Sequence, residues 1–221
     1  MKKADDFDAA IFDLDGTLLD SNDSWAEIDE IYLLKHGITP SPGRSAEMAS
    51  SSYEEVYEQI KKLGITDSFE DFKAEINEIA ENEYTNNIGL KDGAERYLRH
   101  LKDSGKKTAL LTASPEKLYK PALKAHGIYE LFDIFLSAEN TDFDKYNEEI
   151  YFLCASKLQA SPNRCIVFDD LYKCIMAAKS AGMKTVCVYD RYSQLDFFMA
   201  RGFSDEYIYS FSDLLADPKT T

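Results

Sequence analysis

Short apolar runs alternate with helical patterns along most of the chain. Five runs are each bounded by polar or turn residues and are typical of buried parallel strands: AAIF (9–12), KTALL (107–111), DIFL (133–136), CIVF (165–168) and TVCVY (185–189). YIY at 207–209 is a candidate edge strand. Helical patterns separate these runs, at 92–104, 115–126, 147–159 and 171–181. This alternation predicts an α/β fold, with a parallel sheet covered by helices on both faces.

One segment interrupts the alternation. Between Leu18 and Ile88 we find no strand pattern, and apolar residues recur at helical spacing around Trp25, Tyr53 and Phe69. The stretch ITPSPGRSAEMASSS (38–52) is rich in Pro, Gly and Ser and separates the first two of these helices. We therefore expect residues 1–18 and 89–221 to form the α/β core and residues 19–88 to form an inserted all-helical cap, with hinges near 18–21 and 87–91.

The amino-acid composition limits the classes of molecule that the protein is expected to bind. The 221 residues are 44% hydrophobic, which is enough for a sizeable core. Forty acidic against 25 basic residues give a net charge of −15, which argues against nucleic acid and anionic membranes as partners, although a local cationic site could still hold a phosphate. The chain has neither a membrane-length apolar run nor an N-terminal signal-peptide pattern, so we expect a cytoplasmic protein. We also expect it to be a monomer or a weak dimer.

The four cysteines stand singly in apolar or helical surroundings, and no CxxC pair occurs. Neither a zinc site built on cysteine pairs nor a disulfide framework is therefore indicated, and reduced thiols in the core are expected.

Two carboxylates follow the first strand directly, in the stretch AAIFDLDGTLLDS. Asp13 and Asp15 are two residues apart and therefore point to the same side, with Leu14 opposite and Gly16 allowing a sharp turn. A capped surface turn is the plainer interpretation. However, the carboxyl edge of a parallel sheet is where such folds bind ligands, and we favour a functional site there.

Two other strands end in comparable residues. Thr112 closes the second strand and could donate to a phosphate, whereas Ser114 is expected to be a helix N-cap with Pro115 at the first helical position. Asp169 and Asp170 close the fourth strand; alone they would be a helix-dipole pair. Together with the carboxylates of the first strand, they indicate a site for a hard cation such as Mg²⁺. Lys145, taken alone, would be an ordinary solvated lysine.

The motifs Asp-x-Asp-Gly-Thr (13–17), Thr-x-Ser (112–114), Lys145 and Asp-Asp (169–170) occur in this order along the chain. This set resembles the haloacid dehalogenase-like hydrolase superfamily, and the resemblance covers nearly the whole sequence. FDLDGTLLDS is close to the first family motif, and SPNRCIVFDDLYKCIMAAKSAGMKTVCVYD is similar to the last. The position of the insert resembles the helical-cap branch, which includes phosphoglycolate phosphatases and beta-phosphoglucomutases. A Rossmann-like core with a cap domain is implied.

The resemblance implies a role for each motif residue. Asp13 would be the nucleophile that forms an aspartyl-phosphate, and Asp15 the general acid and base. Thr112 and Lys145 would bind and neutralise the phosphoryl group. Asp13, the backbone carbonyl of Asp15, and Asp170 would hold Mg²⁺, with Asp169 a direct or water-mediated ligand. The remaining candidates for substrate binding are Gly16, Thr17, Ala113, Ser114, Lys117, Arg44 and Trp25. Lys117 is more simply explained as a solvated residue on a helix face, and Trp25 as a residue of the core. For Arg44, an exposed loop position is as plausible as substrate binding.

The sequence departs from the family pattern in three places. Asp169 stands where the family often has Glu, so a water would complete its contact to the metal. Lys145-Tyr146-Asn147-Glu148 replaces Lys-Pro-x-Pro, and we expect Asp144 or Asp142 to pair with the lysine in place of the rigid prolines. Leu171 replaces a small or hydroxyl residue.

A phosphatase acting on a small phosphorylated metabolite, such as a sugar phosphate, is the favoured function. Beta-phosphoglucomutases typically carry a histidine early in the first cap helix, and no histidine lies between positions 13 and 35 here. A mutase is therefore the alternative, followed by a catalytically weak binding relative. Phosphoacceptor receiver domains are about half this length and lack the insert.

Overall fold

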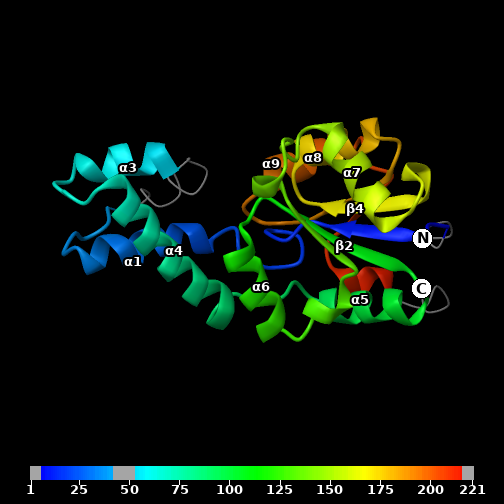
Figure 1. The fold of residues 1–221 in the computed structure, drawn as a ribbon, viewed down its shortest axis with the longest axis horizontal. Helices are drawn as coiled ribbons and strands as arrows, with labels where there is room; N and C mark the ends of the chain where they lie inside the picture. The colour runs from blue at the N-terminus through cyan, green and yellow to red at the C-terminus, as the bar shows by residue number, and fades with distance from the viewer. Residues whose placement is uncertain (1–5, 42–52, 216–221) are drawn as a thin grey trace.

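Six parallel strands form one sheet in the described part of the chain, and the inserted helices lie to one side of it (Figure 1). The computed structural model describes residues 6–41 and 53–215. The strands lie in the order β3-β2-β1-β4-β5-β6, which confirms the predicted α/β fold and the edge strand. Their bounds are β1 Ala9–Phe12, β2 Lys107–Thr112, β3 Ile134–Ser137, β4 Cys165–Asp169, β5 Lys184–Val188 and β6 Glu206–Ile208. Phe12 pairs in register with Leu110 and Phe168, so the three central strands end at the same edge.

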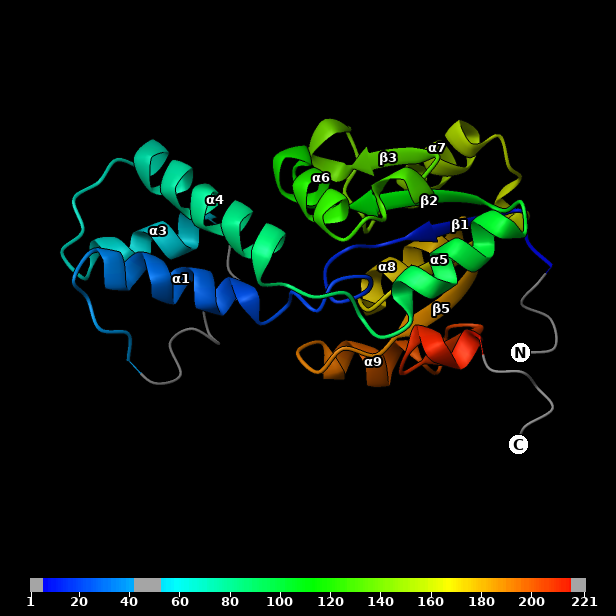
Figure 2. The same ribbon diagram turned by 90° about the horizontal axis from the view of Figure 1, so that it is seen from below.

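Helices cover both faces of the sheet, as predicted (Figures 1 and 2). Ala10 and Phe12 of β1 pack on the side of α5 and α6, whereas Ala9 and Ile11 pack on the side of α7 and α8. Phe12 also stacks on Phe168 at 4.7 Å between ring centroids. The helices of the core are α5 Ala94–Asp103, α6 Glu116–Ala125, α7 Glu148–Leu158, α8 Tyr172–Ser180 and α9 Gln194–Ala200. Four 3₁₀ turns complete the described core: η1 Tyr129–Leu131, η2 Ala138–Asn140, η3 Pro162–Arg164 and η4 Phe211–Leu214.

Helix α9 was not predicted. It has only seven residues, and its apolar residues do not all face the core: Phe197 and Ala200 are buried, whereas Leu195 is 79% exposed. Without a clean apolar stripe, helical periodicity gives no signal at this length. All four cysteines are buried free thiols, as expected. In the part of the chain that the structure describes, no helix is long and apolar enough to span a membrane.

The residues described between β1 and α5 form the helices α1 Ser24–Lys35, α3 Tyr53–Lys61 and α4 Phe69–Asn86. They extend to one side of the sheet instead of covering a face of it (Figures 1 and 2). Helix α4 begins at the N-cap Ser68, whose hydroxyl accepts from the Asp71 backbone N–H at 3.1 Å. It packs against α1 and against α6 of the core, so it joins the inserted helices to the sheet.

The chain enters and leaves the insert at adjacent points. Leu19 and Leu90 form an antiparallel bridge. The Lys91 backbone N–H donates to the Leu18 carbonyl at 2.8 Å, and the Asp20 N–H donates to the Gly89 carbonyl at 3.0 Å. The two expected crossings are therefore hydrogen-bonded to each other.

Candidate active site

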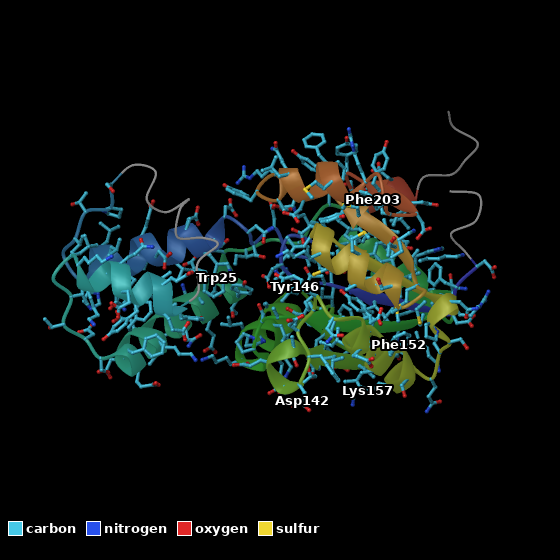
Figure 3. The ribbon with its side chains drawn as sticks, turned by 90° about the horizontal axis from the view of Figure 1, so that it is seen from above. Trp25, Asp142, Tyr146, Phe152, Lys157 and Phe203 are labelled. Atoms are coloured by element: carbon cyan, nitrogen blue, oxygen red, sulfur yellow. The ribbon has the colours of Figure 1, made fainter. Side chains whose placement is uncertain are left out.

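A pocket of about 210 Å³ opens at the carboxyl edge of the sheet. Five of its lining residues were predicted from the sequence: Asp13, Asp15, Ala113, Lys145 and Asp170. The others are Asn22, Ala138, Asp144, Tyr146, Leu171 and Cys174. Tyr146 lies on the part of the core that faces the inserted helices (Figure 3). The strand ends that the sequence singled out therefore meet in one place, as the parallel register requires.

Asp13 and Lys145 form the buried centre of this pocket. The Lys145 Nζ lies 2.6 Å from Asp13 Oδ1 and 2.9 Å from Asp169 Oδ2, and the lysine side chain is only 7% exposed. Burial raises the pKa of Asp13 well above its usual value, Lys145 opposes that rise, and Asp169 and Asp170 add to it. Burial alone would lower the pKa of Lys145, but Asp13 and Asp169 together raise it well above its usual value. Lys145 is therefore a fixed positive charge beside Asp13.

The expected partners of Lys145 were wrong. Asp144 instead accepts from the Tyr146 backbone N–H at 2.8 Å, and Asp142 is exposed. The lysine points inward because two desolvated carboxylates attract it more strongly than a solvated one. In place of the missing prolines, the Tyr151 hydroxyl donates to the Lys145 carbonyl at 3.1 Å and holds the backbone.

Asp170 is held by three residues from the loops that follow β1 and β5. Its Oδ2 accepts from Ser193 Oγ at 2.7 Å and from Asn22 Nδ2 at 3.1 Å, and its Oδ1 accepts from Thr17 Oγ1 at 3.3 Å. Burial, followed by the neighbouring Asp169 carboxylate, raises the pKa of Asp170 to about 7. Sequence reasoning missed Asn22 and Ser193. The one available signal was Asp190, which follows β5 as Asp13 follows β1 and accepts from Asn22 at 3.1 Å.

Asp15 accepts three hydroxyl hydrogen bonds. Ser21 Oγ and Tyr84 Oη donate to Oδ1 at 2.7 and 2.5 Å, and Ser114 Oγ donates to Oδ2 at 2.7 Å. Burial, and then the Asp15 charge, raises the pKa of Tyr84 well above its usual value, so this tyrosine remains a donor at neutral pH. Tyr84 comes from the last turn of α4, and its link to Asp15 gave no sequence signal.

The predicted cap role of Ser114 was wrong. Pro115 occupies the N-cap of α6, and the helix begins at Glu116. The Ser114 hydroxyl instead turns toward Asp15, and its backbone N–H donates to Thr112 Oγ1 at 3.0 Å. The buried Thr112 hydroxyl keeps its own hydrogen for a further acceptor.

Gly16 is required by the local geometry. Its φ is +77°, in the left-handed region. A Cβ at this position would lie 2.2 Å from Asn22 Nδ2 and 2.5 Å from Asp170 Oδ2. The absence of a side chain at Gly16 therefore leaves room for Asn22 and Asp170, in addition to allowing the turn that was predicted after Asp15.

Trp25 and Lys117 do not line the pocket. Trp25 is partly buried and packs edge-on against Tyr53 and Tyr84, with ring centroids 6.3 and 6.1 Å apart (Figure 3). This agrees with the preferred interpretation that Trp25 packs in the core. Lys117 is exposed on α6, in agreement with a solvated helix face. Arg44 lies outside the described residues.

The acidic residues of the pocket fit a divalent cation. One carboxylate oxygen from each of Asp13, Asp169 and Asp170 lies within 4.8 Å of the others, in fully buried surroundings. Lys145 is the one basic side chain paired with this group in the ion pairs of the described residues. Burial, and then the neighbouring carboxylates, raise the pKa values of Asp13 and Asp170. A hard cation with oxygen ligands such as Mg²⁺ would offset the charge of these buried carboxylates.

Comparisons with known proteins identify the family of the chain. A family model described as haloacid dehalogenase-like hydrolase matches residues 7–182. The YhcW protein of Bacillus subtilis is 31% identical over 81% of this chain and 82% of its own length. The phosphorylated carbohydrates phosphatase of Thermotoga maritima is 27% identical over 81% of this chain and 83% of its own. The crystal structure of CbbY from Rhodobacter sphaeroides in complex with phosphate superposes with a TM-score of 0.76, covering 94% of this chain and 96% of that one at 20% identity, and supports the fold.

Proposed function

Because the chain belongs to the haloacid dehalogenase-like hydrolase family, we propose that it is a Mg²⁺-dependent phosphatase that hydrolyses a small phosphorylated metabolite, with sugar phosphates as the substrate class. The observation that carries this proposal is the buried contact of Lys145 with Asp13 and Asp169, beside Asp170, in one pocket. The name of the Thermotoga maritima relative, a phosphorylated carbohydrates phosphatase, supports the substrate class.

The proposed reaction has two steps on the side chain of Asp13. In the first, an Asp13 oxygen attacks phosphorus, the bond from phosphorus to the substrate oxygen breaks, and protonated Asp15 gives its proton to the leaving alkoxide. In the second, Asp15 takes a proton from a water that attacks phosphorus, and the bond from phosphorus to Asp13 breaks. Lys145 and the Thr112 hydroxyl would stabilise the phosphoryl oxygens throughout. Mg²⁺, held by Asp13, Asp170 and the backbone carbonyl of Asp15, with Asp169 beside them, would supply charge neutralisation between the carboxylates and the phosphate.

We further propose that residues 19–88 act as a cap that selects the substrate. The support is the placement of the described helices of this segment. Tyr84 of α4 donates to Asp15, which lines the pocket, and Tyr146 on the core side is half exposed toward the insert. Substrate-dependent closure of such a unit over a catalytic pocket excludes water from the reaction.

Phosphate release from a panel of sugar phosphates and an aryl phosphate, with Mg²⁺ and with a chelator, tests the function. We expect turnover with Mg²⁺, its loss with the chelator, and its return when Mg²⁺ is restored. A preference for sugar phosphates within the panel would support the substrate class.

Two other outcomes would contradict the phosphatase. Folded protein with Mg²⁺ that releases no phosphate, but interconverts sugar phosphates when a bisphosphate is added, would be a mutase. Protein that binds these compounds without either reaction would be a binding relative.

Tyr84 is proposed to position Asp15 from the cap side. We expect Tyr84→Phe to lower kcat by about tenfold with little change in KM, because this hydrogen bond orients the carboxyl group of Asp15 and a typical hydrogen bond contributes about 0.5–1.5 kcal/mol. Steady-state kinetics measure the two constants separately.

Tyr57→Phe is the matched control. Its hydroxyl donates to the Asp67 carbonyl at 2.9 Å, away from the pocket, so both constants should stay near the wild-type values. Equal losses in the two variants, or a change in KM alone for Tyr84→Phe, would argue against a positioning role.

A further inference from the structure

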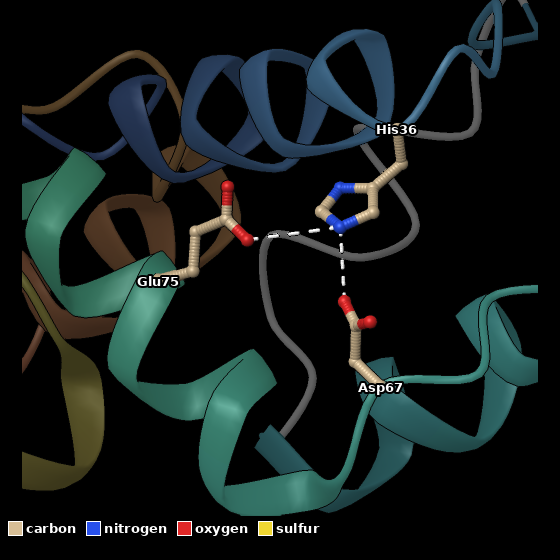
Figure 4. A group of neighbouring side chains, drawn as sticks. All are labelled: His36, Asp67 and Glu75. Atoms are coloured by element: carbon tan, nitrogen blue, oxygen red, sulfur yellow. Dashed lines mark ion pairs between the residues drawn. The ribbon is translucent and has the colours of Figure 1, made fainter.

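A second group of potential metal ligands lies in the insert, apart from the acidic pocket (Figure 4). His36 follows the C-terminal end of α1, Asp67 lies in the segment before α4, and Glu75 is on α4. His36 Nε2 is 2.9 Å from Asp67 Oδ2 and 3.7 Å from Glu75 Oε2. The end of α1 and the first part of α4, with the residue before its N-cap, thus place an imidazole nitrogen between two carboxylates.

The imidazole ring is fixed by its other nitrogen. His36 Nδ1 lies 2.9 Å from the Tyr32 carbonyl oxygen. A carbonyl oxygen only accepts, so Nδ1 carries the hydrogen, and Nε2 is the atom that faces the carboxylates. Ligating histidines in proteins typically have this arrangement, in which the second ring nitrogen donates to a carbonyl or carboxylate.

Both carboxylates are also oriented by neighbours. The Tyr32 hydroxyl donates to Asp67 Oδ2 at 3.1 Å. Lys35 Nζ contacts Glu75 Oε1 at 2.6 Å, which leaves Oε2 to face His36. With a neutral imidazole, two carboxylates and one lysine give this group a net negative charge. That negative charge, together with an Nε2 lone pair directed at two carboxylates, favours a bound cation at this position.

We propose that His36, Asp67 and Glu75 form a binding site for a divalent transition-metal ion of the zinc class. One imidazole nitrogen and two carboxylate oxygens are a donor set that Zn²⁺ accepts, with water in a fourth position. The side chains are 24%, 34% and 25% exposed, which leaves room for entry and for that water. The all-oxygen set of Asp13, Asp169 and Asp170 suits Mg²⁺ instead, so the two sites differ in the metal they prefer.

The bound ion would join the end of α1 to the beginning of α4. It would hold together the part of the insert remote from the pocket, and it is independent of the proposed phosphatase reaction. An imidazolium paired with Asp67 would occupy the same geometry without metal, and the experiment must separate these two states.

Titration of the full chain with ZnCl₂, in the presence of excess Mg²⁺ to fill the acidic pocket, tests the site. The ¹⁵N resonances of the three histidine rings are followed by NMR, and affinity is measured by calorimetry. We expect one saturable Zn²⁺ site that moves the Nε2 resonance of His36 and leaves that of the exposed His100 in place.

Variants assign the site. His36→Gln and Glu75→Gln should each weaken Zn²⁺ binding by at least about tenfold, because loss of a group that merely orients a ligand already costs about 10–100-fold in affinity. His100→Gln is the matched control and should bind as wild type. Unchanged affinity in the folded His36 and Glu75 variants, or saturation with Zn²⁺ that leaves the His36 resonance unmoved in the wild type, would overturn the proposal.

Discussion

Asp13→Asn is expected to reduce phosphate release by about 10⁴-fold or more, as removal of a nucleophile does in other enzymes that form covalent intermediates. The amide keeps the size of the side chain but has no charged oxygen to attack phosphorus. It also removes one of the three carboxylates of the acidic group. Single-turnover and steady-state phosphate release with saturating Mg²⁺ measure the loss.

Asp142→Asn makes the same chemical change at an exposed position that does not line the pocket and is the matched control (Figure 3). Its activity should stay near that of the wild type. Retention of more than a few per cent of activity by folded Asp13→Asn would rule out a nucleophilic role for this residue, because only orientation and electrostatic effects would then be lost.

Lys145→Met is expected to damage both activity and stability. The methionine keeps the long apolar stem but removes the charge that Asp13 and Asp169 contact at 2.6 and 2.9 Å. Loss of one electrostatic contact to a transition state typically costs about 10²–10³-fold in kcat. Breaking a buried ion pair costs about 3–5 kcal/mol in the free energy of unfolding, because the remaining charges stay buried without a partner.

Urea unfolding with a chelator measures the stability loss, and Mg²⁺ should recover part of it by neutralising the same carboxylates. Lys157→Met, on the exposed side of α7, is the control and should change neither quantity appreciably (Figure 3). If Lys145→Met unfolded like this control, the pair with Asp13 and Asp169 would contribute nothing to the fold.

The strand ends were predictable from sequence, and the details of the pocket were not. Apolar runs located β1, β2 and β4, and parallel pairing then required Asp13, Thr112 and Asp169 to meet at one edge. The partners of these residues depend on which side chains lose contact with water. Lys145 pairs with the buried Asp13 instead of its exposed chain neighbour Asp144, and the spacing of these residues in the sequence does not predict this choice.

Residues contributed by distant elements were equally invisible. In the sequence, nothing distinguishes Tyr84 from other tyrosines on amphipathic helices, because its contact with Asp15 depends on how α4 packs on the core. Ser193 lies before a helix that is too short to be predicted. The cluster of His36, Asp67 and Glu75 needs the packing of α1 on α4, because its members are spread along the chain. Sequence periodicity predicts elements, whereas these sites depend on how the elements pack.

Because Leu19 and Leu90 are bridged, the insert begins and ends at neighbouring positions of the core and could be exchanged as one segment. Since the chain departs and returns at neighbouring positions, a hairpin turn of about 2–5 residues could close the core without the intervening helices. Helical segments of different length and sequence could be accommodated at the same junction while the strand order stays intact. With the proposed role of residues 19–88 in selecting the substrate, exchange of this one segment would change substrate preference and leave the strands that carry the acidic pocket in place.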